Sequence, residues 1–243
     1  MTKIPGTVIL LCLPILVFAN LASAENQKIS LLITPLSVPY EALESSKKPL
    51  SNELIAAAER NSMQGRAIGA TEYSSIWFAI VKEMGGLYSP MTGRIIPQKR
   101  LTAVHRLIDE LANKYAMEYI VFPSLEIKNV RSRESAASWD GVRRRVRIYG
   151  QNIAPGDNEI QLVTDVKVVS LRLDIYNRNK EWITTSYGGI NLLNRFKLRR
   201  GGELRIEENK KLYRSKYLTK AAELTIEQLT QDLNQKISEK QDP

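Results

Sequence analysis

The chain has 243 residues and is basic, with 35 Lys and Arg against 26 Asp and Glu, one His and a formal net charge of +9. Hydrophobic residues make up 43% and charged residues 25%, as in an ordinary globular protein. This composition excludes a wholly disordered chain, a collagen and a protein with several membrane spans.

The first 24 residues have the pattern of a cleaved signal peptide. Lys3 supplies a positive start, Val8–Phe18 a short apolar segment, and Ala22–Ala24 a small-residue cleavage site. This cleavage site disfavours the alternative of a retained N-terminal anchor. A lipid anchor would need a cysteine at the cleavage site, and Cys12 lies within the apolar segment instead. We therefore expect a periplasmic protein with one α/β domain over residues 25–243.

Cleavage would remove the only cysteine and leave 34 Lys and Arg against 26 Asp and Glu, a net charge of +8. With no cysteine and a single histidine, we expect no disulfide, no thiolate nucleophile, no metal site and no cofactor. No later apolar stretch is long enough to span a membrane. The positive charge favours anionic partners, namely lipid headgroups, polyanionic envelope polymers or an acidic protein, and the compartment disfavours nucleic acid.

The N-terminal half of the mature chain predicts one strand and three helices. Lys28–Pro35 is a short apolar strand, and a polar loop, Val38–Lys48, precedes a helix over Asn52–Asn61. After a loop with two glycines, residues 71–85 and Gln98–Tyr115 form two further helices. Their apolar residues recur at steps of three and four. These are Tyr73, Trp77, Ile80 and Met84 in the first, and Leu101, Val104, Ile108, Leu111 and Tyr115 in the second.

The next segment predicts two strands joined by a loop and a turn. A strand over Glu118–Lys128 leads into a polar loop over Arg131–Trp139. Asp140 and Gly141 form a turn, and the alternating residues of Val142–Tyr149 indicate a second strand.

A long hairpin follows. The apolar residues of the predicted strand Glu159–Tyr176 change parity near Val168 and Val169, which indicates a β-bulge. A turn at Asn177–Lys180 then leads to a strand over Glu181–Gly188.

The basic, glycine-containing segment Asn194–Asn209 is predicted to be a loop, and Tyr217–Ile237 a terminal amphipathic helix. The order of elements is one strand, three helices, four strands and a helix, with no linker that divides the chain. We predict an α/β (α+β) fold, a single domain with a mixed sheet of about five strands, helices packed on it and a C-terminal amphipathic helix.

This order resembles the anticodon-binding-domain-like fold of bacterial envelope proteins. Among these are the curli secretion-channel component, a lipoprotein that activates a penicillin-binding protein, and the amino-terminal domain of TolB. Lys28–Pro35, the run Leu101–Lys128, the hairpin Val166–Gly188 and the closing helix carry the resemblance. Two strings, 85–93 and 139–142, are similar to strings in exported proteobacterial proteins.

The resemblance implies protein–protein binding at the envelope without catalysis. The chain lacks the lipid-anchor cysteine, the propeller and the channel-forming hairpins of these relatives. No residue role is therefore carried over from them.

Few residues suit catalysis. His105 is the only histidine and lies beside an apolar helical stripe, which favours a structural role or none over a metal ligand or a triad member. Paired carboxylates could support glycosidase-type hydrolysis, although solvated surface acids are the simpler interpretation. The candidates are Asp109 with Glu110, Glu207 with Glu208, and Asp140. We assign no catalytic residue and expect no enzyme.

The strongest charge pattern is the arginine run at 143–147. In a strand, Arg143, Arg145 and Arg147 share one face and could form a docking strip for carboxylates or phosphates. The alternative is a solvated sheet face whose arginines cover apolar surface and pair with acids. A second basic cluster consists of Arg195, Lys197, Arg199, Arg200 and Arg205.

Trp139 and Asp140 precede this strip at the predicted turn. Trp139 is either an exposed anchor for a partner or folded back over the sheet edge, and the high average burial of tryptophan favours the second. The glycines of residues 85–93 do not match a phosphate-binding loop, because no Gly-Lys-Ser/Thr follows them.

The sequence thus predicts a periplasmic, non-enzymatic accessory or adaptor protein. It would bind another envelope protein or an anionic envelope component through Trp139, Asp140, Arg143, Arg145 and Arg147. Two alternatives stay open, namely a carboxylate-dependent envelope hydrolase and a direct binder of anionic lipid or polysaccharide.

Overall fold

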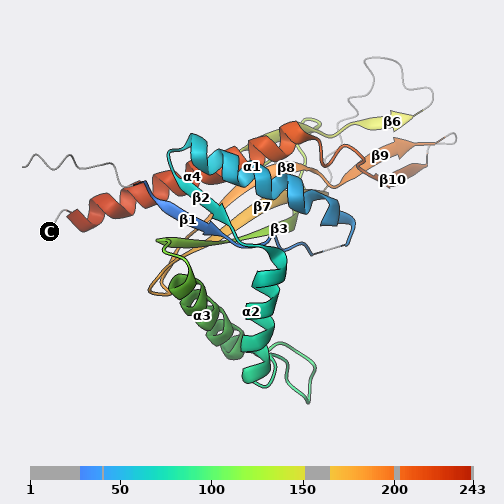
Figure 1. The fold of residues 1–243 in the computed structure, drawn as a ribbon. Coiled ribbons are helices and arrows are strands. Elements are labelled where there is room, and N and C mark those ends of the chain that lie inside the picture. The colour runs from blue at the N-terminus through green and yellow to red at the C-terminus, as the bar shows by residue number, and fades with distance from the viewer. Residues whose placement is uncertain (1–27, 40, 151–164, 200–202, 242–243) are drawn as a thin grey trace, which may run out of the picture.

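Figure 1 shows the computed structural model, which describes residues 28–39, 41–150, 165–199 and 203–241. The predicted signal peptide, the first residues of the predicted strand 159–176 and Arg200 lie outside the described residues. A mixed five-stranded sheet stands at the centre, with helices on both faces and a long C-terminal helix. This arrangement confirms the predicted fold class.

The central sheet has the strand order β2-β1-β3-β7-β8. Its strands are β1 (Ser30–Ile33), β2 (Gln64–Ala67), β3 (Tyr119–Arg131), β7 (Asp165–Asn177) and β8 (Trp182–Leu192). β1 runs parallel to β2 and β3, whereas β3, β7 and β8 form an antiparallel meander. Parallel neighbours need long crossover connections, and the helices of the first half supply them.

Helices cover both faces of this sheet (Figure 1). They are α1 (Lys47–Arg60) and α4 (Ser215–Gln241) on one face, and α2 (Ala70–Glu83) and α3 (Pro97–Lys114) on the other. Alternate residues of β1 divide between the two layers, since Leu31 and Ile33 join the α1–α4 core while Leu32 joins the α2–α3 core. No helix in the described part of the chain is long and apolar enough to cross a membrane.

The predicted helices are present, with local differences. A 3-10 helix, η1 (Glu41–Ser46), and the start of α1 occupy the segment predicted as a polar loop, and Pro49 is compatible with the first helical turn. On α3, Leu101 was expected in the apolar stripe but is 46% exposed, while Leu107 is fully buried. Trp77, which belongs to the predicted apolar stripe of its helix, is partly buried and packs against the α2–α3 core.

A bulge is present at the predicted level of the sheet, but in β8 and not in β7. β7 pairs with β3 without interruption, whereas its pairing with β8 passes from Asn191 to Gly189 and leaves Ile190 as the extra residue. Within β7, alternate residues from Val169 to Ile175 face the α1–α4 core, and Val166 and Val168, on the other face, join a third, smaller core. The apolar residues change parity because the buried face of the strand changes.

The third core lies under a short hairpin of β4 (Ala136–Trp139) and β5 (Val142–Arg145). Asp140 and Gly141 form its turn, both with positive φ (38° and 77°), as a tight two-residue hairpin requires. The turn is therefore confirmed, whereas most of the segment predicted as a loop, Arg131–Trp139, belongs to strands or to tight turns.

A separate three-stranded sheet extends from one end of the molecule (Figure 1). It consists of β6 (Ile148–Gly150), β9 (Asn194–Leu198) and β10 (Leu204–Glu208), in the order β10-β9-β6. The prediction of a loop over Asn194–Asn209 is therefore wrong. Phe196 with Leu198 and Leu204 with Ile206 alternate as in strands, but the basic residues and glycines of the segment were interpreted as a loop. The single strand predicted over Val142–Tyr149 is likewise two strands, β5 and β6, in different sheets.

Two adjacent glycines fix the layers on either side of β8. A Cβ on Gly188 would lie 2.1 Å from the carbonyl oxygen of Ala221 in α4. A Cβ on Gly189 would lie 2.3 Å from Val142 Cγ2 and 2.9 Å from Trp139 Nε1. Because neighbouring strand residues point to opposite faces, α4 and the β4–β5 hairpin both rest directly on the backbone of β8.

Candidate functional site

A basic groove lies where the three-stranded sheet meets the end of β8 and the start of α4. Its volume is about 320 Å³. The side chains that line it are Arg144, Arg145, Arg147, Tyr149, Asn191, Leu192, Asn194, Arg195, Phe196, Asn209, Lys211, Arg214 and Tyr217. Six of these are Lys or Arg, and none of these described lining residues is Asp or Glu. We call this cavity the basic groove.

The side chains of the arginine run, residues 143–147, alternate between exposed and more buried positions, and three of these arginines line the groove. Arg143, Arg145 and Arg147 are exposed, as predicted, while Val142, Val146 and Ile148 are buried. The chain passes from β5 to β6 within this run, so the three arginines do not form one ladder. Arg145 and Arg147 line the groove, whereas Arg143 lies outside its lining and forms an exposed ion pair with Glu134 at 3.6 Å.

Arg144 is the most enclosed cation of the groove. It donates hydrogen bonds to the carbonyl oxygens of Ile190 (3.2 Å) and Arg143 (3.4 Å), and its guanidinium lies 4.7 Å from the ring centroid of Tyr217. Its Nε is buried without a hydrogen-bond partner. Burial lowers the pKa of the guanidinium, because loss of water disfavours the charged form. The side chain is therefore a desolvated cation with an unused donor.

The other walls add positive charge and aromatic surface. Arg195 of β9 stacks on Tyr149 of β6, with 4.0 Å between the guanidinium carbon and the ring centroid. Lys211 and Arg214 come from the turn that precedes α4. Since α4 begins at Ser215, the positive end of its helix dipole lies at the same end of the groove.

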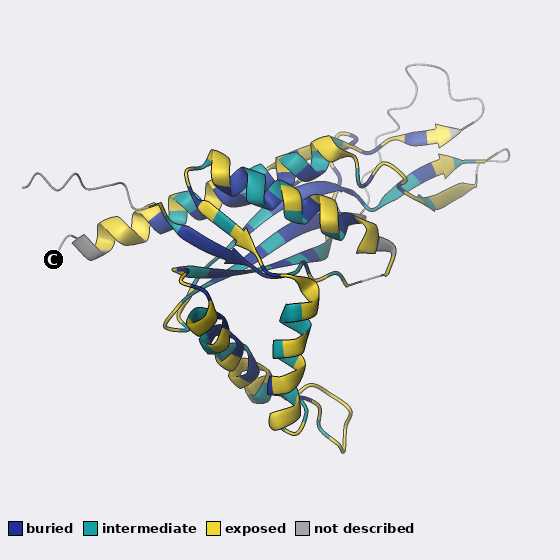
Figure 2. Ribbon diagram, viewed as in Figure 1, coloured by how far each residue is buried: buried dark blue, intermediate teal, exposed yellow. Residues whose placement is uncertain are grey.

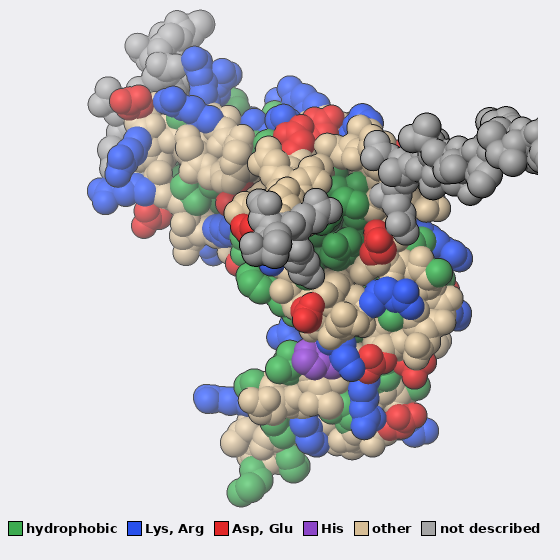
Figure 3. All heavy atoms as spheres, turned by 90° about the vertical axis from the view of Figure 1, so that its left-hand side faces the viewer, with side chains coloured by type: hydrophobic (Ala, Val, Ile, Leu, Met, Phe, Trp, Pro, Cys, Tyr) green, Lys and Arg blue, Asp and Glu red, His purple; other side chains and the backbone are tan. Residues whose placement is uncertain are grey.

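The second basic cluster divides in the structure. Arg195 lines the groove, while Lys197 forms an ion pair with Glu207 across the β9–β10 hairpin at 3.6 Å. Arg199 and Arg205 are exposed on that hairpin. Figure 3 shows Lys and Arg side chains gathered at this end of the molecule, at the upper left of the view.

Trp139 does not form an exposed anchor. It is 7% exposed and packs in the third core against Gly189, in agreement with the folded-back alternative. The Asp140 carboxylate accepts a hydrogen bond from the Ser170 hydroxyl (2.6 Å) and forms an ion pair with Lys128 (2.9 Å). Both residues therefore fasten the hairpin to the sheet, and the structure places neither in the lining of the groove.

The acids considered for hydrolysis are largely paired with cations. Asp109 contacts Lys180 at 3.0 Å, Glu207 contacts Lys197, and Asp140 contacts Lys128. A general acid has to hold a proton before the reaction starts, and an ion-paired carboxylate is poorly suited to this. These contacts lend the hydrolase alternative no support.

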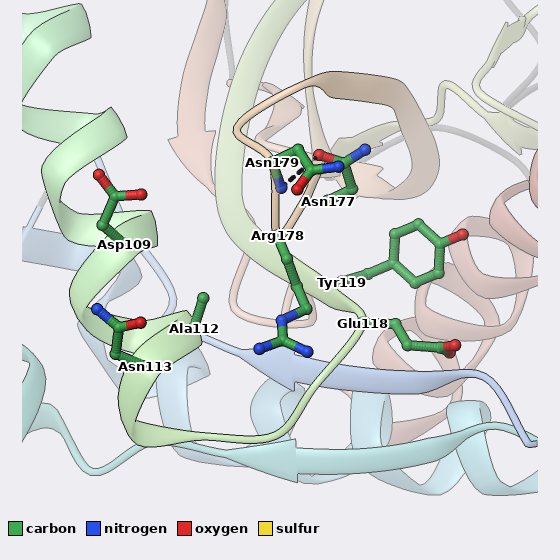
Figure 4. A pocket seen from close by; sticks show the side chains of 8 residues that line it. All are labelled: Asp109, Ala112, Asn113, Glu118, Tyr119, Asn177, Arg178 and Asn179. Carbon is green, nitrogen blue, oxygen red and sulfur yellow. Dashed lines mark hydrogen bonds between the residues drawn. The ribbon is translucent and has the colours of Figure 1, made fainter.

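A second cavity lies between α3 and the β7–β8 turn (Figure 4). Its volume is about 440 Å³, and its charged lining residues are Asp109, Glu118 and Arg178. The Arg178 side chain extends into the space between α3 and Glu118, and the carboxylates of Asp109 and Glu118 lie apart from its guanidinium (Figure 4). Its lining contains both acidic and basic side chains. Unlike the basic groove, it therefore favours neither anionic nor cationic ligands.

His105 lies partly buried on α3. Within the described ranges, no group of three or more His, Cys, Asp or Glu side chains could hold a metal ion. The groove residues that sequence reasoning missed are Arg144, Lys211 and Arg214. Arg144 was assigned to the inner face of the strand. Lys211 and Arg214 belong to a basic run around the start of α4, residues 210–216, which the sequence reasoning did not consider.

Comparisons with known proteins assign no family. No protein-family model matches the chain, and no curated protein matches it. Six chains of solved structures match, among them a variant of PelC from Paraburkholderia phytofirmans, solved as a dodecamer. That match has 10% identity and a TM-score of 0.33 and covers 81% of this chain and 85% of the other. A TM-score this low assigns neither a fold family nor a function, and the resemblance to the anticodon-binding-domain-like envelope proteins stays a prediction.

Proposed function

We propose that the protein is a non-enzymatic component of the bacterial cell envelope that binds an anionic partner through the basic groove. The charge of the groove carries the proposal, since six Lys and Arg line it without a carboxylate among its described lining residues. An anion placed there would supply the counter-charge for the partly buried Arg144 guanidinium. The location at the envelope rests on the signal-peptide pattern of the sequence.

The volume of the groove limits the size of the ligand that it can bind. A volume of about 320 Å³ is at the lower end for ligand pockets, so it accommodates a short segment of a chain and not a folded domain. Arginine forks bind carboxylates and phosphates in two-pronged geometry. The groove therefore suits a carboxylated or phosphorylated segment, supplied either by an envelope polymer or by an acidic stretch of another envelope protein.

Charge reversal on one wall tests this proposal. The double variant Arg145→Glu/Arg147→Glu changes two exposed side chains of the groove, and Arg131→Glu/Arg133→Glu makes the same charge change on exposed residues outside it. We expect the groove variant to lose at least about tenfold in affinity for polygalacturonate, a carboxylated polysaccharide, because two charge-assisted hydrogen bonds are replaced by repulsion. The control variant should lose no more than about threefold.

Titration calorimetry on folded protein, checked by circular dichroism, measures both affinities. Equal losses in the two variants would mean that net charge alone causes binding, and would contradict a groove site. Crosslinking in intact cells then distinguishes the sources. A protein recovered with the wild type and lost only with the groove variant identifies an acidic protein segment as the partner, and recovery of polymer alone identifies an envelope polymer.

A further inference from the structure

The α2–α3 pair ends in an exposed apolar tip, away from the basic groove. Ten large hydrophobic side chains are exposed in the described residues, and five of them lie between positions 78 and 101. They are Phe78 (68% exposed), Tyr88 (60%), Met91 (94%), Ile95 (41%) and Leu101 (46%). We call these five residues the apolar tip. Such clustering marks an interaction site, whereas single exposed apolar residues do not.

The loop that carries the tip is tied by hydrogen bonds. Ile96 N–H donates to the Leu87 carbonyl at 2.8 Å, and Ser89 N–H donates to the Arg94 carbonyl at 2.8 Å. Gly93, which has φ +65°, donates back to the Ser89 carbonyl at 2.8 Å and closes the turn around Met91. The fold thus holds the most exposed apolar side chain of the region at the apex of an ordered turn.

The apolar tip protrudes from the molecule. In Figure 1 the loop between α2 and α3 is the lowest part of the chain, and Figure 2 shows it mostly exposed. Figure 3 shows hydrophobic side chains projecting at the same lower end. A protruding apolar tip can enter a soft interface such as the headgroup region of a bilayer.

The charges around the tip are positive. From Met84 to Ile108 the sequence contains Arg94, Lys99, Arg100 and Arg106 and no Asp or Glu. Lys99 binds the carbonyl oxygens of Met84 and Gly86, both at 3.3 Å, which keeps its charge beside the loop. The nearest acid before the loop, Glu83, forms an ion pair with Arg106 at 3.6 Å. An apolar apex with cations and no acid in its own segment is complementary to an anionic membrane surface.

We propose that the apolar tip docks the protein on the surface of an anionic lipid bilayer. Met91, Phe78 and Tyr88 enter the headgroup region, and Arg94 and Arg100 contact lipid phosphates. This contact is peripheral and uses no membrane span. It is independent of the proposed function, because no residue of the apolar tip lines the basic groove.

A fluorescent label reports insertion directly. Cys12 is the only cysteine of the chain, so Met91→Cys and Ile206→Cys in a Cys12→Ser background each carry one site for an environment-sensitive bimane label. Ile206 is a matched control, 61% exposed on β10. We expect vesicles of phosphatidylethanolamine with phosphatidylglycerol to shift the emission of the label at position 91 to the blue and to leave position 206 unchanged. Phosphatidylcholine vesicles should shift neither.

Vesicle flotation of unlabelled protein, with its N-terminus as processed in the cell, measures the affinity. We expect Phe78→Asp/Met91→Asp to bind the anionic vesicles at least about tenfold more weakly, because two apolar groups lose their transfer into lipid. Ile206→Asp should bind as wild type does. Arg94→Glu/Arg100→Glu should weaken binding and reduce its dependence on salt.

Two results would overturn the proposal. If the label at position 91 responds to vesicles no more than the label at 206, the tip does not enter lipid. If the label at 91 shifts with protein concentration and without vesicles, a second copy of the chain covers the tip instead.

Discussion

The two layers of helices differ in how they use the central sheet. The α1–α4 core contains 23 buried residues and takes side chains from β1, β3, β7 and β8, whereas the α2–α3 core contains 11 and takes fully buried side chains from the sheet only at Leu32 and Ile120. Hydrophobic burial scales with the apolar area removed from water. We therefore expect the α1–α4 layer to contribute most of the free energy of unfolding. The α2–α3 pair contacts the sheet near one end of its helices, and its other end is left for contacts outside the molecule (Figure 1).

The largest loss of stability should follow from adding a side chain where α4 contacts the backbone of β8. Gly188→Ala places a methyl group 2.1 Å from a backbone carbonyl that cannot move without shifting α4. We expect a loss of at least about 3 kcal/mol in the free energy of unfolding, measured in urea. Gly69→Ala is the control, because its Cβ meets nothing within 4 Å and it changes only a helix cap, which costs about 1 kcal/mol or less. Equal losses would show that α4 is not closely seated.

Two leucines compare the layers directly. Leu171→Ala in the α1–α4 core and Leu107→Ala in the α2–α3 core remove the same group from fully buried sites, at about 2–5 kcal/mol each. We expect Leu171→Ala to lower protection from hydrogen exchange throughout the sheet, and Leu107→Ala to lower it mainly in α2 and α3. If Leu107→Ala opens β7 to the same extent, the two layers unfold as one unit.

Two arginines separate binding from stability. Arg172 donates two hydrogen bonds to the Asp174 carboxylate, at 2.9 and 3.1 Å. Arg144 has no carboxylate partner in the described residues, since it donates long bonds to two backbone carbonyls, at 3.2 and 3.4 Å, and its Nε has no acceptor. Arg144→Met should therefore change the free energy of unfolding by no more than about 1 kcal/mol and still weaken binding of polygalacturonate. Arg172→Met leaves Asp174 without its cation and should cost about 1–2 kcal/mol with binding unchanged. A strongly destabilised Arg144→Met would assign that residue to the core.

The smallest expected effect concerns the contact between α2 and α3. Hydrogen bonds from Lys114, and to a lesser extent from Tyr115, lower the pKa of the Glu72 carboxyl below its ordinary value of 4.5. Ionised Glu72 therefore stabilises the folded state above pH 4.5, and this stabilisation is lost as the pH falls through the lowered pKa. Glu72→Gln should lower the unfolding midpoint slightly at neutral pH and not in acid. Glu110→Gln, on the exposed side of α3, should match wild type at every pH. A Glu72→Gln difference that persists in acid would contradict the charge-based cause.

The sequence predicted the parts of the fold that apolar side chains mark. The stripe of α4, the parity change in β7 and the hairpin turn at Asn177–Lys180 are all visible as spacing, and each is present. The edge strand β2 was missed because its residues are mostly exposed and pair through the backbone. The β9–β10 hairpin was missed because its basic residues and nearby glycines were interpreted as a loop, although its apolar residues alternate.

The groove was predictable only in part. Alternation gave the exposure of Arg145 and Arg147, which the structure places in the lining. It could not bring Arg195 and Arg214 to the same cavity, because β6 pairs with β9 in a separate sheet and α4 starts beside it. Contacts between residues of different sheets and helices depend on long-range strand pairing, which local periodicity does not encode.

The adjacent glycines of β8 also determine how a ligand would meet the groove. One wall belongs to α4, where Tyr217 lies one turn from Ala221, and another continues from the β4–β5 hairpin at Arg144. Gly188 and Gly189 seat these two elements on opposite sides of the same strand, one residue apart. The walls are therefore preorganised, and an anion that binds in the groove beside Arg144 orders little of the protein. Affinity among ligands would then depend on the ligand's own stiffness and charge spacing.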